Sequence, residues 1–253
     1  MALALNIGKC TLTGTVRDNN EDALDVQAWP DMTVCLVADG MGGQAHGEVA
    51  SQKAVEIVPR ELRKYLHDVA GDEESKTIIR RAVVQANDEI MAIAALDREM
   101  KSMGTTIVVS VWRKDSSVLY VAGMGDSRVY HLRGKKIEQL TVDHSIAQAL
   151  VEAKTISAAE ARMHRYRNVL WKYLGSAEVG EGPEVKSVPI QAGDRFLLCT
   201  DGLSGVVSDE QLLDFIQSKQ DMQQCADGLG QLALDSNSRD NVSCIVVEVV
   251  EAR

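Results

Sequence analysis

Apolar residues recur along the chain in two patterns, one typical of strands and the other of helices. Short apolar or alternating runs predict strands over residues 10–16, 33–38, 105–112, 118–122, 127–132, 185–190, 195–199 and 242–250. Two longer stretches repeat apolar residues every three or four positions: Val55, Val58, Leu62 and Tyr65 in the first, and Ile79, Val83, Ala86, Ile90 and Ile93 in the second. Each of these stretches predicts an amphipathic helix that covers a flat apolar surface.

The order of these elements predicts the fold class. The strands over 105–112, 118–122 and 127–132 follow one another through short polar turns, which indicates an antiparallel meander rather than alternating β and α units. Two more helices are expected over 208–216 and 221–234. Strands in runs and helices in pairs favour an α+β fold. Its central β-sandwich of two mainly antiparallel sheets is flanked by pairs of helices, a four-layer α-β-β-α arrangement.

Residues 143–182 interrupt this pattern. The stretch is polar and helical, carries several Arg and His residues, and ends in a Gly/Glu turn. We interpret it as an excursion from the sandwich that forms a flap over a site. Because the chain shows no internal repeat, low-complexity segment or linker, we expect one domain over residues 1–253 with this flap as a subdomain.

The amino-acid composition indicates which partners the protein can bind and in which cellular compartment it is expected. The 253 residues are 45% hydrophobic and carry a formal net charge of −10. Such a surface repels the phosphates of nucleic acids and of anionic membranes, so neither is expected as a partner. The N-terminus does not resemble a signal peptide, and no apolar stretch approaches the ~20 residues that cross a bilayer. With five cysteines and no C-x-x-C pair, the sequence favours a soluble cytoplasmic protein with reduced thiols.

The stretch VADGMGGQAHGEVAS, at residues 37–51, joins a predicted strand to a predicted helix through a glycine-rich turn. Such turns usually bind phosphate through backbone N–H groups. Residues 40–45 fit the dinucleotide-binding fingerprint, but a second long helix follows where that unit needs a strand with an acidic residue. A Walker loop is excluded because no Gly-Lys-Ser/Thr ends the turn. Asp39 stands at the mouth of the turn, where a carboxylate would repel a phosphate.

Carboxylates occur at other predicted strand ends as well. They are Glu21 and Asp22 after the first strand, Asp126 between two strands of the meander, Asp201 after strand 195–199 and Asp240 before the last strand. Any one of them is usually only a turn residue. A sandwich can gather several of them at one edge, where they would raise one another's pKa unless a cation neutralised them. The sequence therefore predicts a pair of divalent cations that Asp39 holds and that in turn hold the phosphate.

The chemistry of the ligands indicates which cations these are. All candidate donors are oxygens, the Gly40 carbonyl among them, and the histidines show no zinc-like spacing, which favours Mg²⁺ or Mn²⁺. Two such ions ~3.5–4 Å apart can share a water and lower its pKa. Arg17 suits a bidentate grip on phosphate oxygens, but its spacing fits a surface ion pair with Asp18 or Glu21 equally well.

Six stretches resemble one known family. RDNNEDA, VADGMGGQAHGEVAS, MGTT, GDSRVY, LLCTDGLSG and RDNVSCIVV occur in the order found in the metal-dependent protein phosphatases, the type 2C serine/threonine phosphatases. They are most similar to the compact bacterial branch, and the resemblance extends from about residue 14 to residue 247. It implies a central β-sandwich with two Mn²⁺ or Mg²⁺ ions at one end, and hydrolysis of phosphoserine and phosphothreonine by a metal-activated water.

The resemblance also implies a role for each candidate residue. Asp39 would bridge both metals, and Asp201 and Asp240 would complete the ligands of the first. The Gly40 carbonyl would be a ligand of the second metal, which Glu21 and Asp22 would also bind, directly or through waters. Arg17 would hold the phosphate, and Asp126 with Asp201 would bind a weaker third ion. Met41 stands where some relatives carry a His that is proposed as the general acid, so no acid is assigned.

The function expected from the resemblance is that of a metal-dependent protein serine/threonine phosphatase. Its partners would be phosphorylated proteins and a cognate Ser/Thr kinase pathway, and the chain is expected to be a monomer. Two alternatives remain open: a pseudophosphatase that binds phosphoproteins without turnover, and a metal phosphoesterase for a small molecule. The intact set of Asp39, Asp201 and Asp240 argues against the first, whereas only substrate profiling separates the second.

Overall fold

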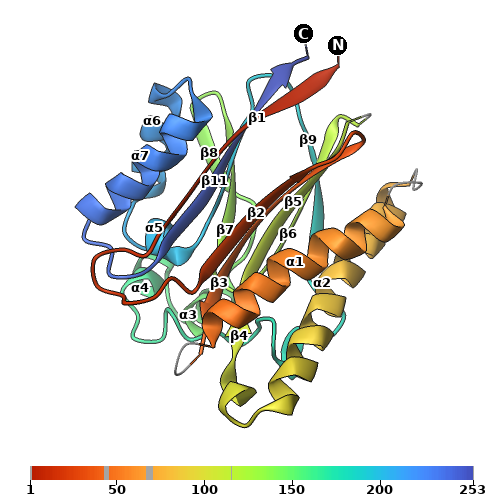
Figure 1. Ribbon diagram of the computed structural model, residues 1–253. Coiled ribbons are helices and arrows are strands. Elements are labelled where there is room, and N and C mark those ends of the chain that lie inside the picture. Colours follow the sequence, from red (N-terminus) through yellow and green to blue (C-terminus); the bar gives the residue numbers. More distant parts are fainter. Residues whose placement is uncertain (1, 43–45, 67–70, 115, 253) are drawn as a thin grey trace.

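Two antiparallel β-sheets lie face to face at the centre of the computed structural model, which describes residues 2–42, 46–66, 71–114 and 116–252 (Figure 1). The first sheet has the order β1-β11-β10-β7-β8, formed by β1 (Leu3–Leu12), β11 (Val242–Glu251), β10 (Arg195–Cys199), β7 (Arg128–Arg133) and β8 (Lys136–Gln139). The second has the order β2-β3-β5-β6-β9, formed by β2 (Asp22–Ala28), β3 (Met32–Met41), β5 (Ile107–Arg113), β6 (Val118–Met124) and β9 (Val185–Pro189). The short β4 (Gly104–Thr105) pairs with the end of β3.

Helices cover the outer faces of both sheets. α1 (Gly47–Tyr65) and α2 (Asp72–Leu96) pack on the second sheet, and α6 (Asp209–Ser218) and α7 (Met222–Asp235) pack on the first (Figure 1). Side chains alternate along each strand, so a central strand such as β3 contributes to two apolar layers. In β3, Cys35 and Val37 join the core between the sheets, whereas Val34 and Leu36 lie beneath α1 and α2. The predicted α+β sandwich with four layers is therefore confirmed.

The remaining helices are short and lie mostly near one end of the sandwich. They are η1 (Glu99–Ser102), α3 (Ile146–Glu152), α4 (Ala158–Arg162), η2 (Ala177–Val179) and α5 (Asp201–Ser204). α3, α4 and η2 belong to the stretch predicted as a flap, and Figure 1 shows α3 and α4 beside α5, at the end away from the two termini. That this stretch is a subdomain of a single domain stays a prediction.

None of the helices within the described ranges combines the length and the apolar character that a bilayer crossing requires. All five cysteines are buried as free thiols.

Two local predictions are wrong at their ends. β1 runs from Leu3 to Leu12, not over 10–16, because the chain turns at Gly14, whose φ of +82° interrupts the extended backbone. Tyr65, expected on the buried face of α1, is exposed, and the Arg81 guanidinium lies 5.4 Å from its ring centroid. The edge strands β2 and β8 were not predicted, because polar residues interrupt both sequences.

The predicted meander is wrong in its third strand. β5 and β6 pair as expected, but β7 pairs with β10 in the other sheet. Between β6 and β7, Gly125 has φ +99°, and a Cβ there would lie 2.5 Å from Cγ2 of Thr106, so only glycine fits this turn. Asp126 consequently lies in a connection that crosses from one sheet to the other.

Candidate metal centre

Side-chain alternation turns two carboxylates toward the space between the sheets. In β3, Cys35 and Val37 face the core between the sheets, so Asp39, two residues further on, faces the same way. In β2, Asp22 stands directly opposite Asp39 in the antiparallel register. Side chains opposite each other in such a pair lie on one face with Cβ atoms about 4.5–5.5 Å apart. The two carboxylates are therefore immediate neighbours.

Asp201 reaches the same place from the other sheet. It is the first residue of α5, close after β10, and the charge of its carboxyl group is among those that raise the pKa of Asp39. The neighbouring Thr200 donates a hydrogen bond from Oγ1 to Oδ2 of Asp22 at 3.1 Å. These contacts bring carboxylates of both sheets together at one end of the sandwich.

The loop between β1 and β2, which carries Arg17 and Glu21, is fastened by Asn241. Its Oδ1 accepts a hydrogen bond from the backbone N–H of Glu21 at 2.8 Å. Its Nδ2 donates to the carbonyls of Thr13 and Asn19 at 2.8 and 2.9 Å. Both ends of the loop are thus held against the start of β11.

Arg17 forms an ion pair at the edge of this loop. Its Nη2 lies 2.9 Å from Oδ2 of Asp240, and the two side chains are 50% and 35% exposed. Arg17 is therefore ion-paired, but the expected partners Asp18 and Glu21 were wrong, because the pair forms with Asp240. An exposed ion pair contributes only ~0–1 kcal/mol. An incoming phosphate can consequently compete for the guanidinium.

The backbone of Gly40 is crowded on both sides. Its N–H donates to the Glu21 carbonyl at 3.1 Å. A Cβ at Gly40 would lie 2.2 Å from the carbonyl oxygen of Gly47 and 2.5 Å from that of Glu21, so this position requires glycine. The end of β3, the start of α1 and the β1–β2 loop meet at this point. Residues 43–45 of the glycine-rich turn lie outside the described ranges.

A chain of hydrogen bonds connects the segment of Asp126 to Asp39. Ser127 shares a 2.6 Å hydrogen bond with Oγ1 of Thr106. Thr106 binds the backbone of Asp39 twice, because its N–H donates to the Asp39 carbonyl at 2.9 Å and its Oγ1 accepts from the Asp39 N–H at 2.9 Å. The connection between the sheets is thereby fixed relative to the centre.

The gathered carboxylates make one another's ionised forms unfavourable. Burial, followed by the charges of Asp22 and Asp201, raises the pKa of Asp39 well above its ordinary value. Burial raises the pKa of Asp22 to about 7, in spite of the hydrogen bonds it accepts. Burial and neighbouring carboxylates also raise the pKa values of Asp126 and Asp201. A cation placed among these groups would remove the repulsion.

The donor set fits hard divalent cations. Carboxylates of Asp22, Asp39 and Asp201 converge, and the other predicted ligand, the Gly40 carbonyl, is also an oxygen, which suits Mg²⁺ and Mn²⁺. Among the described residues, no group of three or more His, Cys, Asp or Glu side chains is placed so that it could hold a metal ion as it stands. The convergence rests on the strand register and on the hydrogen bonds given above.

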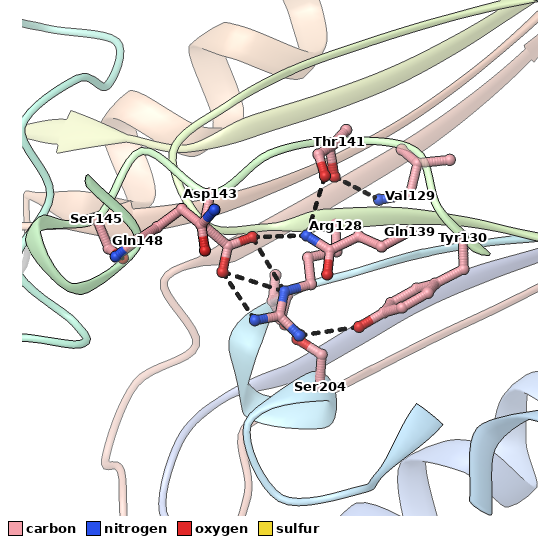
Figure 2. Close-up of polar contacts among 10 residues, drawn as sticks. Arg128, Val129, Tyr130, Gln139, Thr141, Asp143, Ser145, Gln148 and Ser204 are labelled. Atoms are coloured by element: carbon pink, nitrogen blue, oxygen red, sulfur yellow. Dashed lines mark hydrogen bonds and ion pairs between the residues drawn. The ribbon is translucent and has the colours of Figure 1, made fainter. Parts of the chain in front are cut away.

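Arg128 connects the first sheet to the start of the flap. Its guanidinium donates to both carboxylate oxygens of Asp143, at 3.0 Å from Nε to Oδ1 and 2.7 Å from Nη2 to Oδ2 (Figure 2). Its Nη1 donates to the Tyr130 hydroxyl at 2.9 Å, and Gln139 donates to Asp143 at 2.9 Å. The network thus joins β7 and β8 to the residue at which the flap begins.

A cavity of about 380 Å³ lies between the flap and the segment that includes α5 and the start of α6. Asp126 and Asp201 line it beside Arg128, and Arg162 and Arg167 of the flap also line it. Its volume lies in the range of small-ligand pockets. The carboxylate centre therefore opens into a cavity that the flap helps to form.

Several residues that hold the site together were not predicted. Asn241, Thr106 and Arg128 lie within the stretches RDNVSCIVV, MGTT and GDSRVY, so their place in a motif is a signal that could have drawn attention to them. Thr200 carries the same signal, because it precedes Asp201 within the stretch LLCTDGLSG. Asp143 is marked only by its place at the start of the predicted flap.

Comparisons with known proteins agree with this geometry. The chain matches the family described as Protein phosphatase 2C over residues 15–236. It is 34% identical to the serine/threonine phosphatase stp of Listeria welshimeri over 236 residues, which are 93% of this chain and 92% of that protein.

Solved structures show the same likeness. The serine/threonine phosphatase PstP/Ppp of Mycobacterium tuberculosis is 35% identical with a TM-score of 0.84, over 98% of this chain and 99% of that one. The catalytic domain of PstP in complex with two manganese ions is 34% identical with a TM-score of 0.83, over 98% and 100% of the two chains. With its fold and nearly all of its length matched, this chain belongs to the protein phosphatase 2C family.

Proposed function

We propose that this chain is a metal-dependent protein phosphatase that hydrolyses phosphoserine and phosphothreonine. The observation that carries the proposal is the convergence of carboxylates from both sheets at one end of the sandwich. Relatives named serine/threonine phosphatases, at 34% and 35% identity over more than nine-tenths of this chain, support the substrate class.

The carboxylates would hold two Mn²⁺ or Mg²⁺ ions. Asp39 would bridge them, Asp201 and Asp240 would complete one set of ligands, and the Gly40 carbonyl would serve the other set, with Glu21 and Asp22 acting directly or through waters. When bound, the ions supply positive charge that lowers the pKa of a water and offsets the charge of the phosphoryl oxygens. The raised pKa values of Asp22 and Asp39 support this role, because a cation favours their ionised forms.

The chain's own residues would orient the phosphate, and water would supply the proton that the leaving oxygen needs. Arg17 would bind two phosphate oxygens in place of its exposed ion pair with Asp240, which would leave Asp240 to the cation. A P–O bond forms to the oxygen of the attacking water and the P–O bond to the Ser or Thr oxygen breaks. The thioether of Met41 has no proton to donate, so the leaving oxygen takes its proton from water.

A third, weaker ion would bind between Asp126 and Asp201, which line the same cavity. Calorimetric titration with Mn²⁺ tests this: we expect three binding sites in the wild type and two in Asp126→Asn. Two sites in both proteins would exclude the third ion.

We further propose that the substrates are phosphoproteins made by a Ser/Thr kinase of the same cell, and that the chain acts in the cytoplasm as a monomer. The formal net charge of −10 supports partners other than nucleic acid or anionic membrane.

Release of phosphate from a phosphothreonine peptide tests the main proposal. We expect release with Mn²⁺, none with EDTA, and a loss of at least about 100-fold in Asp39→Asn and Asp201→Asn, because even residues that only support metal ligands are worth about 10–100-fold. Asp88→Asn, exposed on α2, is the matched control and should keep full activity. Release that survives EDTA would contradict the mechanism. Folded, Mn²⁺-loaded wild type that releases no phosphate from several peptides or from p-nitrophenyl phosphate would instead be a pseudophosphatase, and release from the small ester alone would indicate a small-molecule phosphoesterase.

A further inference from the structure

We propose that Arg162 and Arg167 form a subsite for an acidic side chain of the substrate, close to the phosphorylated residue. The inference rests on the proposed function and adds to it a preference for the sequence around the phosphorylated Ser or Thr.

Both arginines line a cavity beside the carboxylate centre. They line the cavity of about 380 Å³ into which Asp126 and Asp201 also face, and the opposite wall is the segment over residues 204–211. Arg162 ends α4 and Arg167 follows in the flap. Arg17 does not line this cavity, so the cavity extends away from the proposed phosphate ligand. A peptide whose phosphate lies at the carboxylate centre would therefore place a neighbouring residue in the cavity.

Two of the arginine side chains that line the cavity are not paired with a carboxylate. Of its three arginines, Arg128 is already bound to Asp143 and Tyr130 (Figure 2). Across the described ranges, the guanidinium groups of Arg162 and Arg167 have no carboxylate within ion-pair distance. Two guanidinium groups thus remain available for a ligand.

The carboxylates of the cavity do not cancel these two charges. Asp143 is neutralised by Arg128, and Asp126 and Asp201 belong to the proposed metal sites, which leaves Asp209. Arg162 also senses the charge of Glu210, but that side chain is exposed and such interactions are weak. The cavity therefore offers an excess of positive charge on its flap side.

The sequence of the flap points to the same ligand. Between Glu160 and Glu178 the chain has no Asp or Glu but carries Arg162, Arg165, Arg167 and Lys172, in a protein with a net charge of −10. A basic patch on an acidic protein attracts an acidic partner. The planar guanidinium matches a carboxylate in a bidentate pair, which favours Asp or Glu of a peptide over an apolar side chain.

Phosphothreonine peptides with one Glu or one Gln at each position from three before to three after the phosphorylated residue test the subsite. The measurement is the ratio of kcat/KM for the Glu peptide to that for the matched Gln peptide, with saturating Mn²⁺. We expect a ratio of about 10–100 at one position, mainly through KM, in the wild type. The ratio should fall to about 1 in Arg162→Gln/Arg167→Gln. Arg165→Gln, in the same flap but outside the cavity, is the matched control and should keep the wild-type ratio.

Charge reversal provides a second variant. Arg162→Glu/Arg167→Glu should prefer a Lys peptide over the Glu peptide at the same position. The subsite is overturned if the wild type cleaves Glu and Gln peptides equally at every position, or if the double Gln variant keeps the preference. A wild type that hydrolyses no phosphate ester, including p-nitrophenyl phosphate, with Mn²⁺ would overturn the proposed function itself.

Discussion

The carboxyl groups of Asp22 and Asp39 face each other across two paired strands, where burial and neighbouring charges disfavour ionisation. For an acid whose pKa is higher in the folded than in the unfolded state, the folded state binds more protons between the two pKa values. Its contribution to stability is therefore present below the unfolded pKa and is lost as the pH rises through the folded pKa. For Asp22 this window extends from about pH 4 to about pH 7.

Asp22→Asn should remove this loss of stability. In metal-free buffer, we expect the free energy of unfolding of the variant to increase relative to that of the wild type as the pH rises from 4 to 8. The gain is up to roughly 4 kcal/mol, because each pKa unit corresponds to about 1.4 kcal/mol. Urea denaturation at several pH values measures it. Asp88→Asn, an exposed control on α2, should show no such trend. Parallel pH profiles of wild type and Asp22→Asn would contradict this account.

At the scale of elements, the site depends on how closely β3, α1 and the β1–β2 loop approach one another. Gly40 sets that distance, because a Cβ there would lie 2.2 Å from a backbone oxygen of α1. Backbone atoms cannot rotate away as the end of a side chain can. The elements themselves must therefore separate if this position carries a larger residue.

Gly40→Ala should destabilise the protein by about 1–3 kcal/mol, the usual cost of overpacking. It should also weaken Mn²⁺ binding, because the carbonyl and the carboxylates around it shift together. Urea denaturation and calorimetric titration measure the two effects. Gly71→Ala is the control, since its nearest neighbouring atom would lie 3.8 Å from the new Cβ. Equal stability of Gly40→Ala and the wild type would show that the packing at this point is looser than described.

The flap is attached to the first sheet through the pair of Arg128 and Asp143, whose side chains are 25% and 13% exposed. Asp143→Asn should lower the free energy of unfolding by about 2–3 kcal/mol, because it leaves a largely buried guanidinium without its counter-charge. This loss is somewhat smaller than the 3–5 kcal/mol expected when one partner of a fully buried ion pair is removed. Chemical denaturation measures this. Glu56→Gln, which breaks an exposed pair with Lys53, should cost no more than about 1 kcal/mol. Similar costs for both substitutions would mean that the Arg128 network does not anchor the flap.

At the scale of the whole molecule, the proposed metal centre would join the two sheets, because Asp22 and Asp39 come from one sheet and Asp201 follows a strand of the other. Cations that bind there bind the folded chain only, since the carboxylates meet through folding. Such binding stabilises the folded state by about 2.7 kcal/mol at a free ion concentration of 100 times Kd.

Mn²⁺ should therefore raise the Tm of the wild type by about 5–10 °C, and EDTA should reverse the shift. Differential scanning calorimetry with and without Mn²⁺ measures this. In Asp201→Asn the shift should be much smaller at the same concentration, whereas Asp88→Asn should keep it. A Tm of the wild type that does not respond to Mn²⁺ would exclude a metal site between the sheets.

Much of this architecture was predictable from local patterns. The two long helices and most strands follow from periodicity, and the acidic strand ends are visible as soon as the strands are assigned. β7 was assigned to the wrong sheet because periodicity records which residues a strand buries, not which strand it pairs with. The partner of Arg17 could not be predicted either, since Asp240 lies 223 positions away along the chain.

The sequence by itself determined the α+β class, the family, and the expectation that the candidate metal ligands are oxygens. Each of these follows from hydrophobic periodicity, turn residues or ordered motifs, which are patterns that extend over only a few neighbouring residues. The tertiary structure alone decided that Asp22 stands opposite Asp39, that Asn241 holds the loop of Arg17, and that flap arginines share a cavity with Asp201. These juxtapositions depend on strand register and on the packing of two sheets. Both are set by contacts between segments far apart in the chain, which no local pattern contains.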